Sequence, residues 1–339
     1  MDSVTQATLG AAIGEAVLGR KIGNKAALYG AIVATLPDLD VFVPMGGPVA
    51  DFTYHRGASH SLVVLTVITP VIATALHKFR RDPPDMRRSW FWLVFLALIT
   101  HPLLDAFTIY GTQLFWPLSS YPFGLGSIFI IDPLFTLPVL IGLLIALISS
   151  RTYVTGHRAN ACGLAAGAAY LAWTVFAQIH ANGVAKQSLT AEGVSYDRLL
   201  TIASPFNTLL WRSIATGRGG EMYYVGYNSL VDGSDAVAFN RFPAGQRQAE
   251  ALNGHWPADR MRWFTKGFYR ARLEDTGLVM TDLRMGVEGR YAFSFKVADI
   301  LDGVVQPSLD QRIPPVRTMH GAGVLWDRIW DANVTLVTP

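Results

Sequence analysis

The stretch from residue 90 to residue 107 reads WFWLVFLALITHPLLDAF and indicates the class of protein to which the chain belongs. A predominantly apolar run of about 20 residues is long enough to cross the hydrocarbon core of a bilayer as a helix. His101 and Asp105 lie near the end of this run. Because ionisable groups at membrane depth cost about 2.5 to 3.5 kcal/mol each, they usually mark function. The stretch therefore predicts a membrane-spanning helix with a functional site at one end.

Further apolar stretches lie before and after this one. Residues 62–79, 128–148 and 161–179 approach the length of a membrane span, and residues 4–19 and 26–36 form two shorter stretches. The Gly and Ala content of the first short stretch suits close packing between helices. We expect a membrane-embedded bundle of about six helices, two of them short.

The composition changes near residue 180. Residues 1–180 contain 11 Lys and Arg and 9 Asp and Glu, whereas residues 181–339 contain 17 and 16. Aromatic and β-branched runs at residues 222–227, 263–269 and 291–297 are separated by Asp and Gly, which predicts strands. The sequence thus predicts a membrane-embedded helical domain at residues 1–180 and a soluble, mainly β or α+β domain at residues 181–339.

The charges predict the orientation and exclude some partners. Ten of the 11 basic residues in the first half form clusters at residues 20–25, 78–88 and 151–158, which are alternate helix ends. Basic loops face the cytoplasm, so the acidic ends and residues 181–339 are expected outside it. Neither half has the basic block that nucleic-acid binding needs. The single cysteine, Cys162, excludes a thiolate metal cluster.

Six His and Asp residues on the acidic side have the spacing of metal ligands. His101 and Asp105 are four residues apart, so their side chains lie on one face of a helix. The other four residues form two close pairs, one around a Gly-containing turn and one at a helix end. Imidazole and carboxylate together suit zinc, with manganese as the alternative, better than calcium. The predicted ligands of one or two divalent metal ions are Asp38, Asp40, His55, His60, His101 and Asp105.

Each predicted ligand also has an ordinary structural interpretation. Asp38 can end a helix after Pro37, and His60 with Ser61 can cap the helix that follows. The presence of all six residues on one side favours a metal site over separate structural roles.

Arg56 is a basic residue on this otherwise acidic side, and it lies between His55 and His60 in the sequence. A fixed guanidinium binds carboxylate or phosphate in a forked geometry and stabilises negative charge that develops in a transition state. Arg56 is therefore the predicted catalytic residue, and the expected substrate carries an anionic group.

Four parts of the sequence resemble a known family. They are residues 1–6, LPDLD at residues 36–40, YHRGASHS at residues 54–61, and THPLLD at residues 100–105 with Thr108, Tyr110, Gly111 and Gln113. These motifs are similar to those of the YdjM-like membrane-bound metal-dependent hydrolases, also labelled LexA-binding, inner-membrane-associated hydrolases, over about residues 1–180. The resemblance implies a bound metal, hydrolase activity and a bacterial-type inner membrane. Residues expected to support the ligands or contact substrate are Asp2, Gln6, Ser61, Tyr110, Gln113 and Asp132.

The leading hypothesis is a multi-pass inner-membrane hydrolase with a periplasmic C-terminal domain. Metal-activated water would attack an anionic ester or phosphoester, and the partner is a membrane lipid or an anionic small molecule. The HxxxD pair is also similar to lipid phosphatases of the acid-phosphatase type, which need no metal, but their KxxxxxxRP and PSGH motifs are missing from the sequence. The alternative is a non-catalytic membrane protein with a structural metal site and a partner-binding soluble domain.

Overall fold

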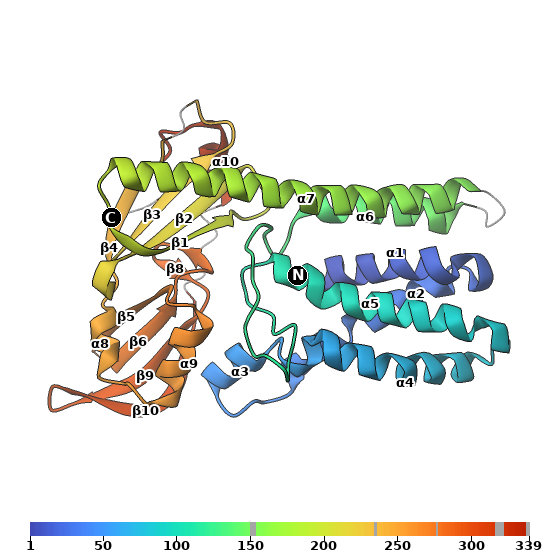
Figure 1. The fold of residues 1–339 in the computed structure, drawn as a ribbon, viewed down its shortest axis with the longest axis horizontal. Coiled ribbons are helices and arrows are strands. Elements are labelled where there is room, and N and C mark those ends of the chain that lie inside the picture. Colours follow the sequence, from blue (N-terminus) through green and yellow to red (C-terminus); the bar gives the residue numbers. More distant parts are fainter. Residues whose placement is uncertain (150–153, 234–235, 276, 316–321, 337–339) are drawn as a thin grey trace. The chain divides into compact units, whose positions relative to one another are not determined.

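The structure is a computed structural model that describes residues 1–149, 154–233, 236–275, 277–315 and 322–336 (Figure 1). It forms two compact units, and each is discontinuous in sequence. The first unit comprises Met1–Val43, Arg56–Val175 and Pro205–Asn207, and the second comprises the described parts of Pro44–His55, Phe176–Ser204 and Thr208–Pro339. The boundary expected after residue 180 falls inside α7 (Val154–Ala191), a helix that contributes to both units.

The first unit is the expected helical bundle. Its helices are α1 (Ser3–Ile22), α2 (Lys25–Thr35), η1 (Pro37–Phe42), η2 (Ala58–His60), α4 (Leu62–Arg80), η3 (Pro84–Met86), α5 (Arg87–Phe107), α6 (Pro133–Ile148) and the first part of α7. Among the described residues, three helical segments are long and apolar enough to cross a membrane: Leu62–Arg80, Pro84–Phe107 and Val154–Ala191. The helix expected at residues 128–148 is shorter, because Asp132 caps α6 and Pro133 begins it.

Helix α5 packs against α1, α2 and α4. Trp90, Leu93 and Leu98 of α5 are buried in one apolar cluster with Leu18 of α1 and Leu65 of α4. Helices α1 and α2 pack closely, as the Gly and Ala content predicts. A Cβ atom on Gly30 would lie only 2.1 Å from the Gly10 carbonyl oxygen. This tight core fixes the end of α5 that carries His101 and Asp105.

The second unit confirms the expected sheet-rich domain. One antiparallel sheet has the order β1-β2-β3-β4 and the other has the order β10-β9-β6-β5, while β7 and β8 form a separate hairpin. The strands are β1 (Tyr196–Ala203), β2 (Leu210–Gly217), β3 (Met222–Ser229), β4 (Phe239–Pro243), β5 (Tyr269–Glu274), β6 (Gly277–Asp282), β7 (Gly286–Val287), β8 (Arg290–Tyr291), β9 (Ser294–Leu301) and β10 (Val304–Ile313). The helices are α3 (Pro48–Tyr54), α8 (Gln246–Glu250), α9 (Trp256–Phe264), α10 (Ala322–Trp330), the 3-10 turn η4 (Arg218–Gly220) and the end of α7.

One predicted strand is wrong. Residues 222–227 lie in β3, and residues 291–297 are divided between β8 and β9, but residues 263–269 do not form a strand. Pro257 starts helix α9, which ends at Phe264. Lys266 and Gly267 then adopt positive φ values of 55° and 82° in a turn, and β5 begins only at Tyr269. Three of the four aromatic residues of this run therefore belong to a helix and its C-terminal turn, and only Tyr269 lies in a strand.

Candidate metal centre

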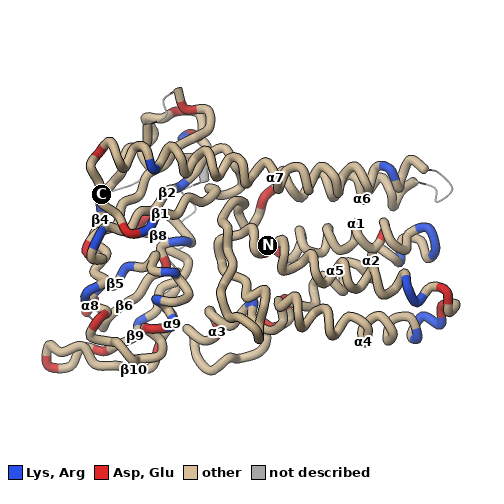
Figure 2. Tube along the Cα trace, in the orientation of Figure 1, with Lys and Arg blue, Asp and Glu red and all other residues tan. Residues whose placement is uncertain are grey.

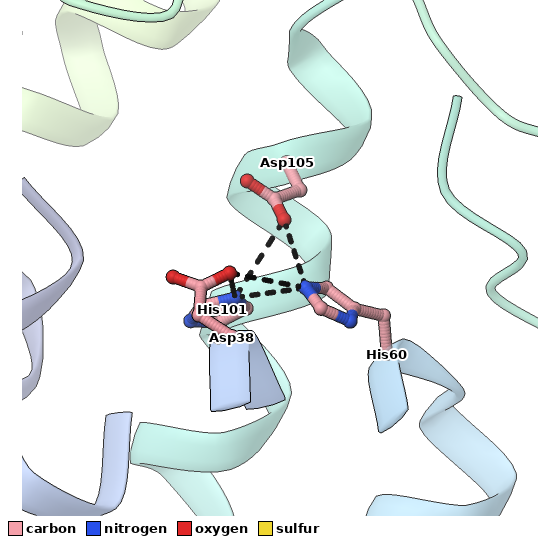
Figure 3. Close-up of side chains that lie close together, drawn as sticks. All are labelled: Asp38, His60, His101 and Asp105. Carbon is pink, nitrogen blue, oxygen red and sulfur yellow. Dashed lines mark hydrogen bonds and ion pairs between the residues drawn. The ribbon is translucent and has the colours of Figure 1, made fainter. Parts of the chain in front are cut away.

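Four side chains from three segments of the first unit converge beside the end of α5 (Figure 3). Asp38 comes from η1, His60 from η2, and His101 and Asp105 from successive turns of α5. One ligand atom from each residue lies within 4.8 Å of the ligand atoms of the other three. We call these four residues the His/Asp centre.

Five of the six distances between the donor atoms are nearly uniform, and the sixth, between the two carboxylates, is within 4.8 Å. His60 Nε2 and His101 Nε2 are 3.2 Å apart, and Asp38 Oδ1 is 3.4 Å from each of them. Asp105 Oδ2 is 3.4 Å from His60 Nε2 and 3.6 Å from His101 Nε2. A tetrahedral ion with bonds of about 2.0 to 2.1 Å separates its ligands by about 3.3 Å. The spacing therefore fits a small divalent ion.

Hydrogen bonds orient both imidazoles toward the centre. His101 Nδ1 donates to the Ala34 carbonyl oxygen at 2.6 Å, which leaves the lone pair of Nε2 facing the other donors. His60 Nδ1 lies 2.9 Å from Ser59 Oγ and 3.6 Å from Asp40 Oδ2. Ser59 Oγ in turn donates to Asp40 Oδ2 at 2.5 Å. A metal-bound His commonly has such a partner on its second nitrogen, so Asp40 supports His60 instead of joining the four donors.

Asp105 provides an oxygen atom that suits a cation. Its Oδ1 accepts hydrogen bonds from Gln6 Nε2 at 3.1 Å and from the Met1 amino group. Its Oδ2 is buried and faces both imidazoles, and Arg56 Nε lies 3.3 Å from it. A buried carboxylate is costly unless positive charge lies beside it, and a metal ion at the centre would add to the charge that Arg56 supplies.

The charges around the centre also favour a cation. Burial opposes ionisation of Asp38, but hydrogen bonds from His101 and His60 bring the pKa of the Asp38 carboxyl well below its ordinary value. Burial opposes the charged form of His60, but hydrogen bonds to Asp105 and Asp38 raise its pKa above the ordinary value. The two carboxylates thus attract positive charge to the centre.

Arg56 is buried beside the centre and contacts Asp105. Its Nε lies 3.3 Å from Asp105 Oδ2, and its Nη1 donates to Thr108 Oγ1 at 3.3 Å. The guanidinium lies over the ring of Tyr110 at 4.8 Å, and the Gln113 backbone N–H donates to the Arg56 carbonyl oxygen at 3.0 Å. Two of the expected supporting residues, Tyr110 and Gln113, therefore hold Arg56.

Other predicted site residues have structural contacts. Asp2, Ser61 and Asp132 cap α1, α4 and α6, respectively. Asp132 also accepts a hydrogen bond from Tyr170 at 2.9 Å. His55 directly follows α3, lies in the second unit, and is outside the group of four donors that the described residues form.

The sequence did not assign roles to two groups that orient the imidazoles. Ser59 lies inside the motif at residues 54–61, so the sequence offered its hydroxyl as a candidate partner for a neighbouring imidazole. Ala34 acts through its carbonyl oxygen, and no side chain at that position signals the contact. This contact depends on the packing of α2 against α5, which the sequence alone does not reveal.

Comparison with known proteins identifies the family of the first unit. The family described as YdjM inner membrane protein matches residues 1–181, which is more than half of the chain. The chain belongs to this family. The match to the YdjM family includes the whole His/Asp centre and Arg56. Family membership and the three apolar helices support a membrane location.

Two relatives match part of the chain. The chain is 31% identical over 140 residues to the uncharacterized protein YfhP of Bacillus subtilis strain 168, which covers 39% of this chain and 42% of that protein. It is 31% identical over 114 residues to the inner membrane protein YbcI of Escherichia coli strain K12. This match covers 33% of this chain and 64% of that protein. The chain therefore spans less than two thirds of either relative. No solved structure matches it.

The geometry predicts which variants lose metal. Protein purified without chelators should contain about one divalent ion per chain, measured by elemental mass spectrometry. His60→Ala and His101→Ala should lose it, because each removes a donor atom. Asp40→Asn should bind it roughly 10- to 100-fold more weakly, because it supports a ligand.

His55→Ala is the matched control and should keep its metal. The assigned centre is wrong if folded His55→Ala loses metal as completely as His60→Ala. It is also wrong if the unmodified protein holds less than about a tenth of an ion and takes up neither zinc nor manganese.

Proposed function

We propose that the chain is an integral-membrane, metal-dependent hydrolase that acts on an anionic ester or phosphoester, with a lipid-derived compound as the favoured substrate. The observation that carries this proposal is the set of four buried or partly buried donor atoms, five of whose six separations are 3.2 to 3.6 Å. Two imidazoles and two carboxylates suit zinc, with manganese as the alternative. Because Asp40 is engaged with His60 and Ser59, the proposal is for one ion.

The residues of the centre would have different roles in hydrolysis. A bound divalent ion lowers the pKa of a coordinated water to about 7 and polarises the scissile group. His60, His101 and Asp105 are fully buried at the side chain and would hold the ion in place. The Asp38 side chain is 22% exposed, so it would face the incoming substrate. Its Oδ1 would bind the ion, and its Oδ2, which is outside the four donor atoms, would accept a proton.

One observation favours the alternative of a structural metal site. Four protein ligands are the number found in closed structural zinc sites, whereas catalytic zinc usually has three and a water. The role of Asp38 therefore distinguishes a hydrolase from a non-catalytic membrane protein whose soluble domain binds a partner.

Asp38→Asn tests this difference. As a hydrolase, the variant should keep most of its metal and lose about a hundredfold or more of the hydrolysis rate, because the proton acceptor is gone. Rates on activated phosphodiesters and carboxyl esters, together with metal content and melting temperature, measure both properties. Loss of metal and of thermal stability equal to that of His101→Ala would instead support the structural site.

Arg56 has two proposed roles at this centre. Its contact with Asp105 would hold that carboxylate in position, and its positive charge would stabilise the anionic group of the substrate. Burial and the contacts with Thr108 and Tyr110 keep the guanidinium in one orientation.

Arg56→Ala should keep the metal but hydrolyse the same esters about a hundredfold more slowly, which corresponds to roughly 3 kcal/mol. Arg56→Lys keeps the positive charge but loses the forked geometry of the guanidinium, so it should hydrolyse the esters faster than Arg56→Ala and more slowly than the unmodified protein. Metal content measured beside the rates decides between the two roles. If folded Arg56→Ala loses its metal, Arg56 only organises the ligands, and the role in substrate binding is wrong.

The same proposal includes an orientation. In the bundle, Lys and Arg gather where α1 ends, α4 ends and α5 begins, as Figure 2 shows. Basic loops remain in the cytoplasm, so the His/Asp centre and the sheet-rich domain would lie outside it in a multi-pass protein.

Reporter fusions after Pro339 test this orientation. Alkaline phosphatase, which is active only outside the cytoplasm, should be active there, and green fluorescent protein exported through the same route should be dark. The reverse pattern would overturn the periplasmic position of the C-terminal domain. Fusions in the basic loop at residues 81–86 are the matched control and should show the cytoplasmic pattern.

A further inference from the structure

Two loops near the His/Asp centre expose large apolar side chains. The first includes η1, which also carries Asp38, and its Phe42 side chain is 80% exposed. The second connects α5 to α6, and its Leu118 side chain is 81% exposed. We call nine of the exposed apolar residues of these loops the apolar collar: Leu39, Val41, Phe42, Val43, Phe115, Trp116, Leu118, Tyr121 and Leu125.

The collar lacks the charges of a surface that faces water. Residues 106–131 contain no Asp, Glu, Lys or Arg, whereas soluble proteins have about 25% charged residues. The first loop has two charged residues, Asp38 and Asp40, and both contact His60. A large exposed apolar patch marks an interaction site. Trp and Tyr in the second loop are typical of the boundary between lipid and water.

Hydrogen bonds tie the second loop to the start of α4 and to Ser61, the residue that follows His60 of the centre. The Leu62 backbone N–H donates to the Leu114 carbonyl oxygen at 2.9 Å, and Ser61 Oγ donates to the Trp116 carbonyl oxygen. Leu62 is the first residue of α4, a segment long and apolar enough to cross a membrane. Val67, one turn further on, is 70% exposed, so the collar continues the apolar surface of α4.

We propose that the apolar collar lies in the headgroup layer of the bilayer, and that the His/Asp centre takes an anionic phospholipid from this layer. The occupant of the collar is lipid because its surface continues that of α4. The partly exposed ligand, Asp38, belongs to the same 3-10 turn as Leu39 and Phe42, so the open side of the centre adjoins the collar. The substrate class rests on the proposed function, whereas the position of the collar does not.

Site-directed spin labelling tests the position of the collar in the full chain in phosphatidylglycerol and phosphatidylcholine vesicles. The single cysteine, Cys162, is exposed and is first replaced by serine. Nitroxides are then attached to Phe42→Cys and Leu118→Cys. Leu309→Cys, at an 86% exposed position in the sheet-rich unit, is the aqueous reference, and Val67→Cys is the lipid reference.

The ratio of collision rates with oxygen and with a water-soluble nickel chelate reports depth. Labels at positions 42 and 118 should give ratios several-fold above that at 309 and approach that at 67. Ratios equal to that at 309 overturn the inference. Shielding from both reagents also overturns it, because protein would then cover the collar, either the second unit or a second copy.

A paired assay tests the substrate class. The metal-loaded protein should hydrolyse phosphatidylglycerol in vesicles at least tenfold faster than its deacylated, water-soluble headgroup ester. Equal rates, or hydrolysis of neither, overturn an anionic phospholipid as the substrate.

Metal content measured on the same samples separates the two proposals. If the collar lies in lipid but the protein binds no metal, the proposed position of the collar is correct and the proposed hydrolase is wrong. If the collar is exposed to water and the protein binds metal, the proposed hydrolase remains supported and the proposal that substrate enters from the lipid is wrong.

Discussion

Two carboxylates and two imidazoles lie within 4.8 Å of one another at the end of an apolar helix, and this arrangement governs the first unit. Placing a buried carboxylate and a partly buried one so close together is unfavourable unless positive charge compensates them. Arg56 compensates part of this charge from one side, and a divalent ion among the four donors would compensate the rest. The Ala34 carbonyl oxygen contacts the His101 ring and Asp40 contacts the His60 ring, and these two contacts hold each Nε2 toward the centre.

Helix α5 connects the fold with the site. Its first turns bury Trp90, Leu93 and Leu98 in the bundle, and its later turns present His101 and Asp105. A tightly packed helix keeps the two donors in register with η1 and η2, which are short turns with little core of their own. The chemistry therefore depends on packing that begins more than two helical turns away.

The sequence predicted the helices and named the four residues that the structure brings together, because those signals are local. Apolar length indicates a helix in a membrane, and the spacing of His101 and Asp105 follows from the helical repeat. The pairing of Arg56 with Asp105, and the separation of Asp40 from the four donors, depend on how distant segments pack. The strand expected at residues 263–269 failed for a similar reason, because aromatic residues suit a buried helix face as well as a strand.

The central claim is that a metal ion binds among His60, His101, Asp38 and Asp105. X-ray absorption at the edge of the metal in the purified full chain tests it most directly. The account predicts two imidazole nitrogens and carboxylate oxygens at about 2.0 to 2.1 Å, without sulfur. It also predicts that the imidazole signal weakens or disappears in His101→Ala. A spectrum with sulfur neighbours, or one unchanged in His101→Ala, would contradict the account.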